Sequence, residues 1–565
     1  MAMARMFLAE NGKALGPIII PTNADRVTRF AASELRKYLK QISGAEFVLK
    51  HSWRGVTPGE TAVFLGAGPW EAEFGLNLDP SQHPFDGFAL HYRGPHLFIC
   101  GHNPRSTLYG VYALLEEIGC AFIEPGIEHV PRRQIVALEG RNRREVGAFA
   151  LRNIYAAPNH YQKRAPFTAL DRTVTVPQID WMAKRRLNHY DFYVNFYRYD
   201  LWEKHKGEVL EALLDRGFDI EVTHHSLHYF CPPDENHDFG DFGPATYLRN
   251  HPDWYLPGLE CGARGRWQTR VELPAVQKII VERFLQYLDR NPELKICGLW
   301  PDDIPINRPY RGLSHTDGYM KFWNRAADAL AASFPDKLLA IIGYFELSPP
   351  PRTVTPRRNI HCWYCPIARN LMYPVAHPRN ERFLKWLKGW IKAMPPHQTA
   401  SFEYYGWQME LTPLRFMMQK DLPLYHDLGL GGIYGWSAFG NSLLGEDMRW
   451  AVDLFFLAHQ LWDTKADPRK LEAMWAEGVF GRAAPEILDF YAFLARTHAR
   501  EIKNGLAPIY QWIAFDVVHK AQAILAAARK RAETPAIRRR VDLLEKVLLR
   551  GSAEVIWREG KARVV

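Results

Sequence analysis

The amino-acid sequence predicts an α/β protein: a (β/α)8 TIM barrel preceded by a small N-terminal α/β domain and followed by a C-terminal helical region. Between residues 146 and 466, short apolar runs of strand length alternate with helical patterns eight times, as in parallel sheets covered by helices. Before this stretch, a few strands are mixed with two helices, and after it the pattern is wholly helical. We therefore expect three domains, at 1–140, 146–466 and 467–565.

The N-terminal domain is predicted from two helices, one strand and a hairpin. Apolar residues recur at helical spacing after Asn23 or Asp25, either of which is suited to cap a helix, and Gly44 ends this pattern. Gly119 ends the second helix in the same way. The expected elements are, in order, a helix at 27–42, a strand at 61–66, a hairpin of 87–92 and 97–101, and a helix at 106–118.

Eight strands, with helices between them, are predicted for the barrel. The expected strands are 149–155, 187–195, 219–226, 295–300, 337–345, 359–365, 399–407 and 431–437. The expected helices are 177–186, 202–216, 275–289, 316–333, 381–393, 413–428 and 446–461. Eight such repeats close into a barrel whose active site lies at the C-terminal ends of the strands. After about Asp467, apolar stripes indicate helices that pack on the barrel or form the surface of a homodimer.

Composition and charge argue against several classes of function. The net charge is +9, but the basic residues are spread rather than clustered, which argues against nucleic-acid binding. Seven cysteines without framework spacing argue for reduced thiols, and the C-x-x-C pair Cys362 and Cys365 points to opposite faces of a predicted strand. No apolar run reaches about 18 residues and the N-terminus has no signal-like core. We therefore expect no membrane span and a cytoplasmic protein, or a secreted one if a signal was removed.

The stretch from Lys295 to Asp303 carries the strongest functional signal. It begins as a buried strand and ends in Trp300, Pro301 and two adjacent carboxylates, Asp302 and Asp303. Aromatic rings stack on the C–H faces of sugars, and paired acids hydrolyse glycosidic bonds. Further aromatic and histidine side chains fall at the other predicted strand ends. The residues expected to bind a carbohydrate substrate are His224, His225, Trp300, Tyr344, Trp363, Tyr364, Tyr405, Trp407 and Trp436.

Four carboxylates are candidates for the catalytic acid and its partner. Asp302 and Asp303 leave the same strand, and their mutual repulsion is expected to keep one of them protonated as a general acid. Glu346 and Glu403 follow neighbouring or facing strands, and Asp303 with Glu403 would supply the wider spacing of an inverting enzyme. The alternative for the two aspartates is a turn-capping role before Pro305.

No metal and no cofactor are expected. His224, His228 and Asp302 could meet at one strand end, but no pair of histidines has the helical spacing of a metal-binding motif. We expect the adjacent His224 and His225 to include one structural side chain and one ligand of a sugar hydroxyl.

Two parts of the sequence resemble known families. The run N-P-R-S-T-L-Y-G-V-Y-A-L-L-E-E-I-G-C-A-F-I-E-P-G, Asn103 to Gly126, resembles the end of the non-catalytic N-terminal domain of family 20 hexosaminidases and family 67 α-glucuronidases. The region from Phe149 to about Ala466 resembles the domain of unknown function 4838 group, which includes glycoside hydrolase family 163. The motifs that carry this second likeness are P-D-D after strand four, G-Y-F-E-L-S-P-P-P at strand five, F-E-Y-Y in strand seven and G-L-G-G-I-Y-G-W at strand eight.

The second resemblance implies endo-β-N-acetylglucosaminidase-like cleavage of a β-linked N-acetylhexosaminide in an oligosaccharide or glycoconjugate. The reaction would be retaining and substrate-assisted. One of Asp302 and Asp303 would orient the acetamido group, whose carbonyl oxygen acts as the nucleophile, and a nearby acid would protonate the leaving oxygen. Family 20 enzymes carry Asp-Glu at this strand end, so the departure at Asp303 leaves Glu346 or Glu403 open as the acid. The run N-R-P-Y-R-G-L-S-H also stands where the 4838 group often has a cysteine cluster, which leaves the linkage open.

Two other functions stay open on the sequence alone. An α-glucuronidase-like or other uronic-acid hydrolase would act by inversion and bind the substrate carboxylate through Arg152, Lys184 or Arg308. A non-catalytic carbohydrate-binding barrel would keep the aromatic rim but pair its acids with arginines.

Overall fold

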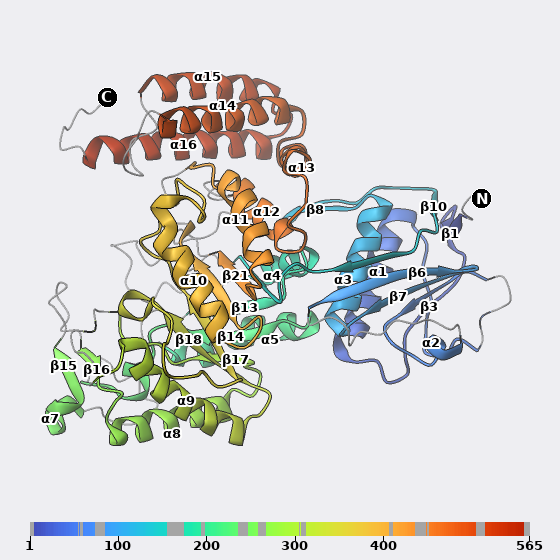
Figure 1. The fold of residues 1–565 in the computed structure, drawn as a ribbon. Helices are drawn as coiled ribbons and strands as arrows, with labels where there is room; N and C mark the ends of the chain where they lie inside the picture. Colours follow the sequence, from blue (N-terminus) through green and yellow to red (C-terminus); the bar gives the residue numbers. More distant parts are fainter. Residues whose placement is uncertain are drawn as a thin grey trace.

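The computed structural model describes residues 5–54, 56, 60–73, 85–154, 175–193, 198–234, 247–257, 267–303, 306, 312–405, 411–435, 448, 451–503 and 515–558. Eight of its strands form one parallel sheet in the order β12-β21-β20-β19-β18-β17-β14-β13. The two end strands meet where the Asn188 N–H donates to the Arg152 carbonyl at 3.3 Å. The sheet is therefore a nearly closed barrel surrounded by helices (Figure 1), and the predicted (β/α)8 fold is confirmed.

Each barrel strand falls within one of the eight predicted segments, because buried parallel strands leave near-continuous apolar runs in the sequence. The strands are β12 (Leu151–Asn153), β13 (His189–Tyr193), β14 (Asp219–Thr223), β17 (Ile296–Gly298), β18 (Leu338–Gly343), β19 (Ile360–Tyr364), β20 (Thr399–Glu403) and β21 (Gly432–Gly435). The surrounding helices are α4 (Val176–Lys184), α5 (Asp200–Asp215), α8 (Pro274–Arg290), α9 (His315–Ser333), α10 (Glu381–Ala393), α11 (Arg415–Asp427) and α12 (Ala451–Gln460). The long connection from β14 to β17 contains α6 (Leu227–Phe230), α7 (Tyr247–Asn250), η3 (Pro252–Trp254) and the antiparallel pair β15 (Tyr255–Pro257) and β16 (Trp267–Thr269).

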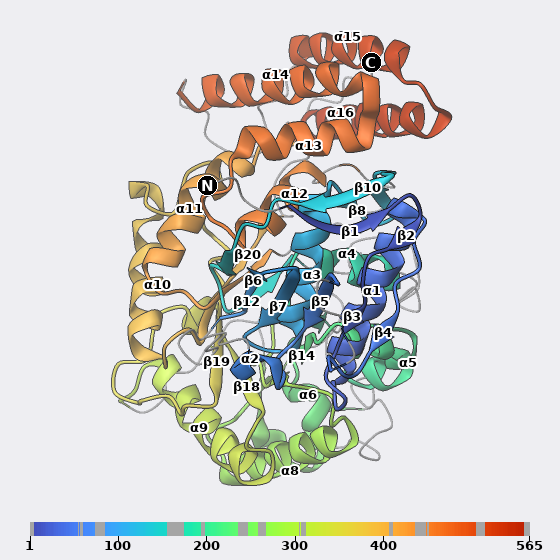
Figure 2. The same cartoon turned by 90° about the vertical axis from the view of Figure 1, so that its right-hand side faces the viewer.

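The N-terminal part contains a six-stranded sheet, β11-β6-β7-β5-β3-β4, packed against two helices (Figure 2). The first helix, α1 (Arg26–Ser43), begins where Asp25 accepts the N–H of Thr28 and ends at Gly44, whose φ of 75° is left-handed. The second, α3 (Pro104–Ile118), is capped by Asn103. The strands of this part are β1 (Met6–Glu10), β2 (Lys13–Ala14), β3 (Ile18–Ile19), β4 (Leu49–Lys50), β5 (Ala62–Leu65), β6 (Gly87–Arg93), β7 (His96–Gly101), β8 (Ala121–Glu124), β9 (Ile127–His129), β10 (Ile135–Leu138) and β11 (Arg143–Val146), and a short helix, α2 (Trp70–Glu73), follows β5.

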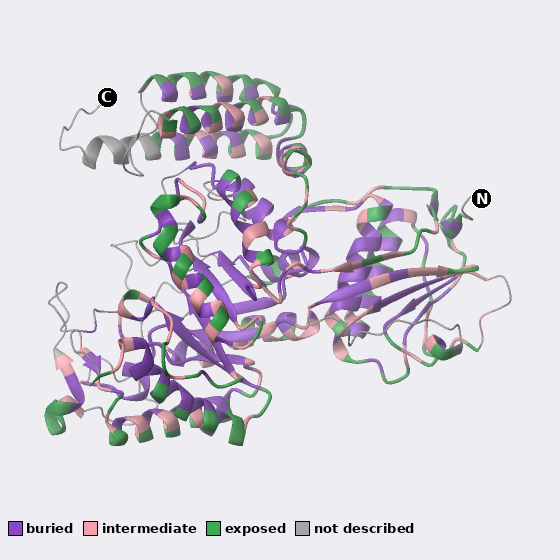
Figure 3. Ribbon diagram, in the orientation of Figure 1, coloured by how far each residue is buried: buried purple, intermediate pink, exposed green. Residues whose placement is uncertain are grey.

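The C-terminal part is helical, as predicted. It comprises α13 (Pro468–Phe480), α14 (Ala484–Lys503), α15 (Phe515–Arg531) and α16 (Pro535–Arg558), with the last three lying side by side (Figure 1). Their apolar stripes, which include Val517, Ala521 and Leu544, are buried, while their outer faces are exposed (Figure 3). In the described part of the chain we find no helix with both the length and the apolar character needed to cross a bilayer.

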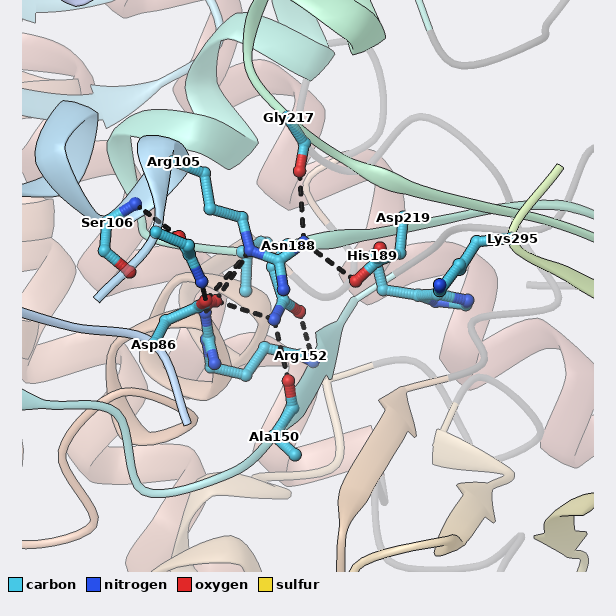
Figure 4. Close-up of polar contacts among 12 residues, drawn as sticks. Asp86, Arg105, Ser106, Ala150, Arg152, Asn188, His189, Gly217, Asp219 and Lys295 are labelled. Atoms are coloured by element: carbon cyan, nitrogen blue, oxygen red, sulfur yellow. Dashed lines mark hydrogen bonds and ion pairs between the residues drawn. The ribbon is translucent and has the colours of Figure 1, made fainter. Parts of the chain in front are cut away.

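A buried ion-pair cluster joins the N-terminal part to the barrel (Figure 4). Asp86 accepts from Arg105 Nε at 2.9 Å, Arg152 Nη2 at 2.5 Å and Asn188 Nδ2 at 2.9 Å. Burial raises the pKa of Asp86, but the charges of Arg105 and Arg152 lower it by more, so this pKa lies well below its ordinary value. Arg105 also contacts Asp219, the first residue of β14, at 2.7 Å. Because Asp219 begins its strand and Asn188 precedes β13, the N-terminal part contacts the end of the barrel opposite to the predicted site.

A second buried carboxyl group, Glu124 at the end of β8, connects the N-terminal part to α13. The Trp475 indole N–H donates to it at 2.8 Å. Burial raises the pKa of Glu124 from 4.5 to about 8. Between these two values the folded protein holds a proton that the unfolded chain releases, so the stability that this group contributes falls as the pH rises from 4.5 to 8.

We expect Glu124→Gln to remove this pH dependence and to raise the free energy of unfolding at pH 8.5 by about 2–4 kcal/mol, because the amide accepts from Trp475 without ionising. Wild type and variant should have similar stability at pH 4.5. Urea unfolding at both pH values tests this, with the exposed Glu139→Gln as control. Equal stability of wild type and Glu124→Gln at pH 8.5 would contradict the buried, protonated carboxyl.

Candidate active site

Strand alternation divides the predicted site residues between the interior and the outer face of the barrel. On β19, Trp363 faces the interior, where its Nε1 donates to the Glu221 carboxylate of β14 at 2.8 Å. The next residue, Tyr364, faces outward, and its hydroxyl donates to the Phe383 carbonyl of α10 at 3.0 Å. Tyr364 therefore lies between the sheet and a helix, a position that does not support its predicted role in substrate binding. Trp363 is only 1% exposed and is an enclosed interior ring rather than an open platform.

Glu403, predicted as a catalytic acid, also belongs to the outer face. Arg369 Nη1 contacts its two oxygens at 3.0 and 2.9 Å, and the hydroxyls of Tyr425 and Ser401 donate to Oε1 at 2.7 and 2.8 Å. The preceding residue, Phe402, takes the interior side of β20. The Glu403 carboxylate is fully buried and paired with an arginine, so these contacts do not support its predicted role as an acid or as one member of an inverting pair.

The same outer cluster includes Tyr405. Burial, followed by the charge of Glu403, raises the pKa of Tyr405 well above its ordinary value, and its buried hydroxyl has no hydrogen-bond partner among the described residues. This position does not support the predicted contact with substrate. The predicted residues that lie outside the described part of the chain are Trp407, Trp436 and Arg308.

Asp303 follows β17, with His225 and Tyr344 against one of its oxygens. The Tyr344 hydroxyl donates to Oδ1 at 3.3 Å, and His225 Nε2 lies 3.7 Å from the same atom. His225 Nδ1 contacts the Pro301 carbonyl at 2.5 Å and must donate to it, so in a neutral ring the Nε2 lone pair faces the carboxyl group. The Asp303 side chain is 25% exposed, so this acid both contacts polar side chains of two neighbouring strands and reaches the solvent.

Asp302 is held differently from its neighbour. It is buried, and its Oδ2 accepts from the backbone N–H and the hydroxyl of Thr269, both at 3.1 Å, while His228 Nε2 lies 3.2 Å away. These contacts tie the strand end to β16 and α6. The other oxygen, Oδ1, has no hydrogen-bond partner among the described residues. Asp302 is therefore fixed in position and keeps one oxygen able to accept from a ligand.

Trp300 and the adjacent histidines pack together beside the two acids. The ring of His225 lies 4.5 Å from that of His224 and 6.1 Å from that of Trp300, centroid to centroid. Trp300 is 1% exposed, and its Nε1 has no partner in the described part of the structure. A buried donor of this kind is suited to a ligand oxygen. The predicted groups His224, His225 and Trp300 are thus brought together with Asp303.

Glu346 belongs to η4 (Phe345–Leu347), the short turn after β18. Its Oε2 accepts the N–H of Ile306 at 3.1 Å. This contact fixes the chain a few residues beyond Asp303. Glu346 stays a candidate acid, and its hydrogen bond with Ile306 positions the chain at that residue.

The barrel interior contains a polar network that sequence reasoning missed. His189 lies between Asn153, at 3.0 Å, and the Glu221 carboxylate, at 2.8 Å. Asp191, two residues further along β13, is fully buried, and burial followed by the charge of Glu221 raises its pKa well above the ordinary value. His189 and Asp191 have the two-residue period of one strand face. This two-residue spacing of polar side chains could have indicated a polar interior face in the strand predicted at 187–195, which was treated as wholly apolar.

None of the described His, Cys, Asp and Glu side chains gather in a group of three or more that could hold a metal ion. The described strand ends carry buried aromatic side chains, among them Trp300 and Trp363, and two differently held aspartates, Asp302 and Asp303. The fold and this site define a (β/α)8-barrel protein with acid groups at the strand ends.

A family model described as Domain of unknown function (DUF4838) matches residues 122–492, more than half of the chain, so the protein belongs to this family. A curated relative, "Alpha-glucuronidase A" of Emericella nidulans, is 35% identical over 109 residues. That match spans 19% of this chain and only 13% of the relative.

Solved structures share the fold at low sequence identity. A GH115 4-O-methyl-α-glucuronidase with specificity for decorated arabinogalactans has a TM-score of 0.62 at 11% identity, covering 97% of this chain and 73% of that one. A GH138 enzyme targeting pectin rhamnogalacturonan II has a TM-score of 0.58 at 9% identity, covering 95% and 69%. The Streptomyces plicatus N-acetyl-β-hexosaminidase has a TM-score of 0.50 at 11% identity, covering 84% and 91%.

Proposed function

We propose that this protein is a glycoside hydrolase that cleaves a β-linked N-acetylhexosaminide by a retaining, substrate-assisted mechanism. The observation that carries the proposal is the unequal setting of two adjacent acids. Asp302 is buried and clamped by Thr269, with one oxygen left to accept, whereas Asp303 is partly exposed and contacts His225 and Tyr344. One fixed acceptor and one accessible acid are the two groups that this chemistry needs.

Each acid has one task in the proposed reaction. Asp302 accepts from the acetamido N–H and so aims the acetamido carbonyl oxygen at the anomeric carbon. That oxygen forms a bond to the anomeric carbon while the glycosidic bond breaks, and Asp303 gives its proton to the departing oxygen. Asp303 then takes a proton from water as the water opens the cyclic intermediate, which restores the configuration and the acid. Tyr344 and His225 position Asp303 for both proton transfers.

The fold shared with enzymes of several glycoside hydrolase families, one of them an N-acetyl-β-hexosaminidase, supports a hydrolase on a sugar. A non-catalytic barrel would pair its acids with arginines. Glu403 has such a partner, and Asp303 contacts the Tyr344 hydroxyl and lies 3.7 Å from His225 Nε2, two groups that can position a general acid. The pairing at Glu403 is explained by its place on the outer face.

Hydrolysis of an α-glucuronide is the second candidate, because the curated relative and one structural neighbour bear that name. Two of the basic side chains predicted to bind a uronate carboxylate, Arg152 and Lys184, form ion pairs with other carboxylates of the protein. Arg152 pairs with Asp86, and Lys184 pairs with Glu128 at 2.5 Å and with Asp180. With Glu403 also turned outward, the described residues favour the N-acetylhexosaminide.

The test is hydrolysis of a panel of 4-nitrophenyl glycosides: β-N-acetylglucosaminide, β-N-acetylgalactosaminide, α-glucuronide and β-glucuronide. We expect turnover of an N-acetylhexosaminide, and a fall of about tenfold or more when its acetyl group is replaced by trifluoroacetyl, because fluorine weakens the attacking carbonyl oxygen. Turnover of the uronides alone would support the second candidate. An unchanged rate with the fluorinated substrate would overturn the substrate-assisted mechanism while keeping the hydrolase.

A further inference from the structure

Phe345 is an aromatic residue that the fold holds at the surface, next to the proposed acid. Its φ of 48° lies in the left-handed region, which a bulky side chain seldom adopts. Its side chain is 41% exposed, whereas Trp300 and Trp363 are each 1% exposed. An exposed ring buries little apolar area to offset an unfavourable backbone conformation. Core packing therefore does not explain this position.

The ring of Phe345 continues the line of contacts that starts at Asp303. Its centroid lies 4.0 Å from that of Tyr344, at an interplanar angle of 38°. The Tyr344 hydroxyl in turn donates to Asp303. Phe345 begins η4, whose third residue, Leu347, is buried and anchors the turn. The exposed ring of Phe345 thus packs against Tyr344, the residue whose hydroxyl contacts the proposed proton donor.

We propose that Phe345 forms the platform for the sugar on the leaving-group side of the cleaved bond. The platform would take the C–H face of a hexopyranose. This inference rests on the proposed function: the N-acetylhexosamine ring lies toward the buried side of the site, by Asp302 and Trp300, and the proton from Asp303 goes to the bridging oxygen. The next sugar then emerges past Asp303 toward the solvent, where Phe345 is an exposed ring among the described residues. The preferred substrate is accordingly an oligosaccharide or glycoconjugate with a sugar beyond the cleaved bond.

The test compares one glycone with two leaving groups. A β-linked disaccharide of N-acetylglucosamine places a sugar on the platform, whereas N-acetylglucosaminyl fluoride places none there. For Phe345→Ala we expect kcat/KM on the disaccharide to fall about five- to tenfold more than kcat/KM on the fluoride. Phe345→Tyr should restore the disaccharide reaction. Equal losses on both substrates, or no loss on the disaccharide, would overturn the platform.

Phe416→Ala is the matched control. Phe416 is 46% exposed on α11, where it lies beside Arg415, whose partners Asp453 and Glu472 belong to α12 and α13. It removes an exposed phenylalanine without touching the site, so both substrates should react as with wild type. A wild type that cleaves neither of these substrates nor the 4-nitrophenyl β-N-acetylgalactosaminide of the panel refutes the proposed function. In that case the platform is tested by calorimetric titration with N-acetylglucosamine oligosaccharides. Binding that is weaker in Phe345→Ala but not in Phe416→Ala supports the platform. No binding, or equal binding in both variants, overturns it.

Discussion

Asp303→Asn is expected to lower kcat on an N-acetylhexosaminide with a poor leaving group by about 10³-fold, because an amide has no proton to give to the departing oxygen. Substrate binding should change little, since the amide keeps the shape of the side chain and its contact with Tyr344. The decisive measurement compares a sugar leaving group, which needs protonation to depart, with a dinitrophenyl leaving group. The dinitrophenolate departs without protonation, so the loss in the first chemical step should be much smaller for that substrate.

Asp302→Asn supplies the matched comparison for this prediction. Asp302 acts on the acetamido group rather than on the leaving oxygen, so its loss should be similar for both leaving groups. Both variants are expected to unfold at the same urea concentration as wild type to within a small shift, which separates chemistry from stability. If Asp303→Asn lowers kcat equally for both leaving groups, Asp303 is not the proton donor, and Glu346 becomes the next candidate.

The barrel could be predicted because its signal is local and repeated. A strand such as β18 (Leu338–Gly343) is buried on both faces and leaves an apolar run that needs no knowledge of its neighbours. Helix ends are equally local: Asp25 and Gly44 form the two caps of α1 through contacts within a few residues. Asp302 and Asp303 could be singled out for the same reason, since they follow a strand directly.

Local sequence patterns could not predict whether a side chain at a strand end points into the barrel or toward the outer helices. Glu403 and Asp303 both follow apolar segments, but a shift of one residue sends a side chain outward instead of inward. In β20 the interior position belongs to Phe402, and the partner that stabilises Glu403, Arg369, comes from the loop after another strand. The contact of His225 with Pro301 likewise joins segments 76 residues apart. Such pairings depend on the register of strands that only the folded sheet defines.

Arg369 is the residue whose loss should cost the most stability. It contacts Glu403 at 2.9 Å and also pairs with Asp421, and all three side chains are at most 1% exposed. In Arg369→Leu the buried carboxylates of Glu403 and Asp421 both lose their ion pair with Arg369, so we expect the free energy of unfolding to fall by about 3–5 kcal/mol. Urea unfolding at pH 7 measures this, with Arg357→Leu, which removes a surface ion pair with Asp328, expected to have no measurable effect.

The partner variant Glu403→Gln separates a structural role from a catalytic one. If Glu403 serves only to pair with Arg369, the variant should be less stable than wild type, because the arginine is then buried with half of its counter-charge, while kcat in the folded fraction stays within a few-fold of wild type. Replacing both Glu403 and Arg369 by leucine should recover part of the stability lost in Arg369→Leu, because an apolar pair carries no desolvation cost. A fall in kcat of about 10²-fold or more in a Glu403→Gln variant of unchanged stability would instead indicate that Glu403 is catalytic. The Glu403 side chain would then have to face the barrel interior.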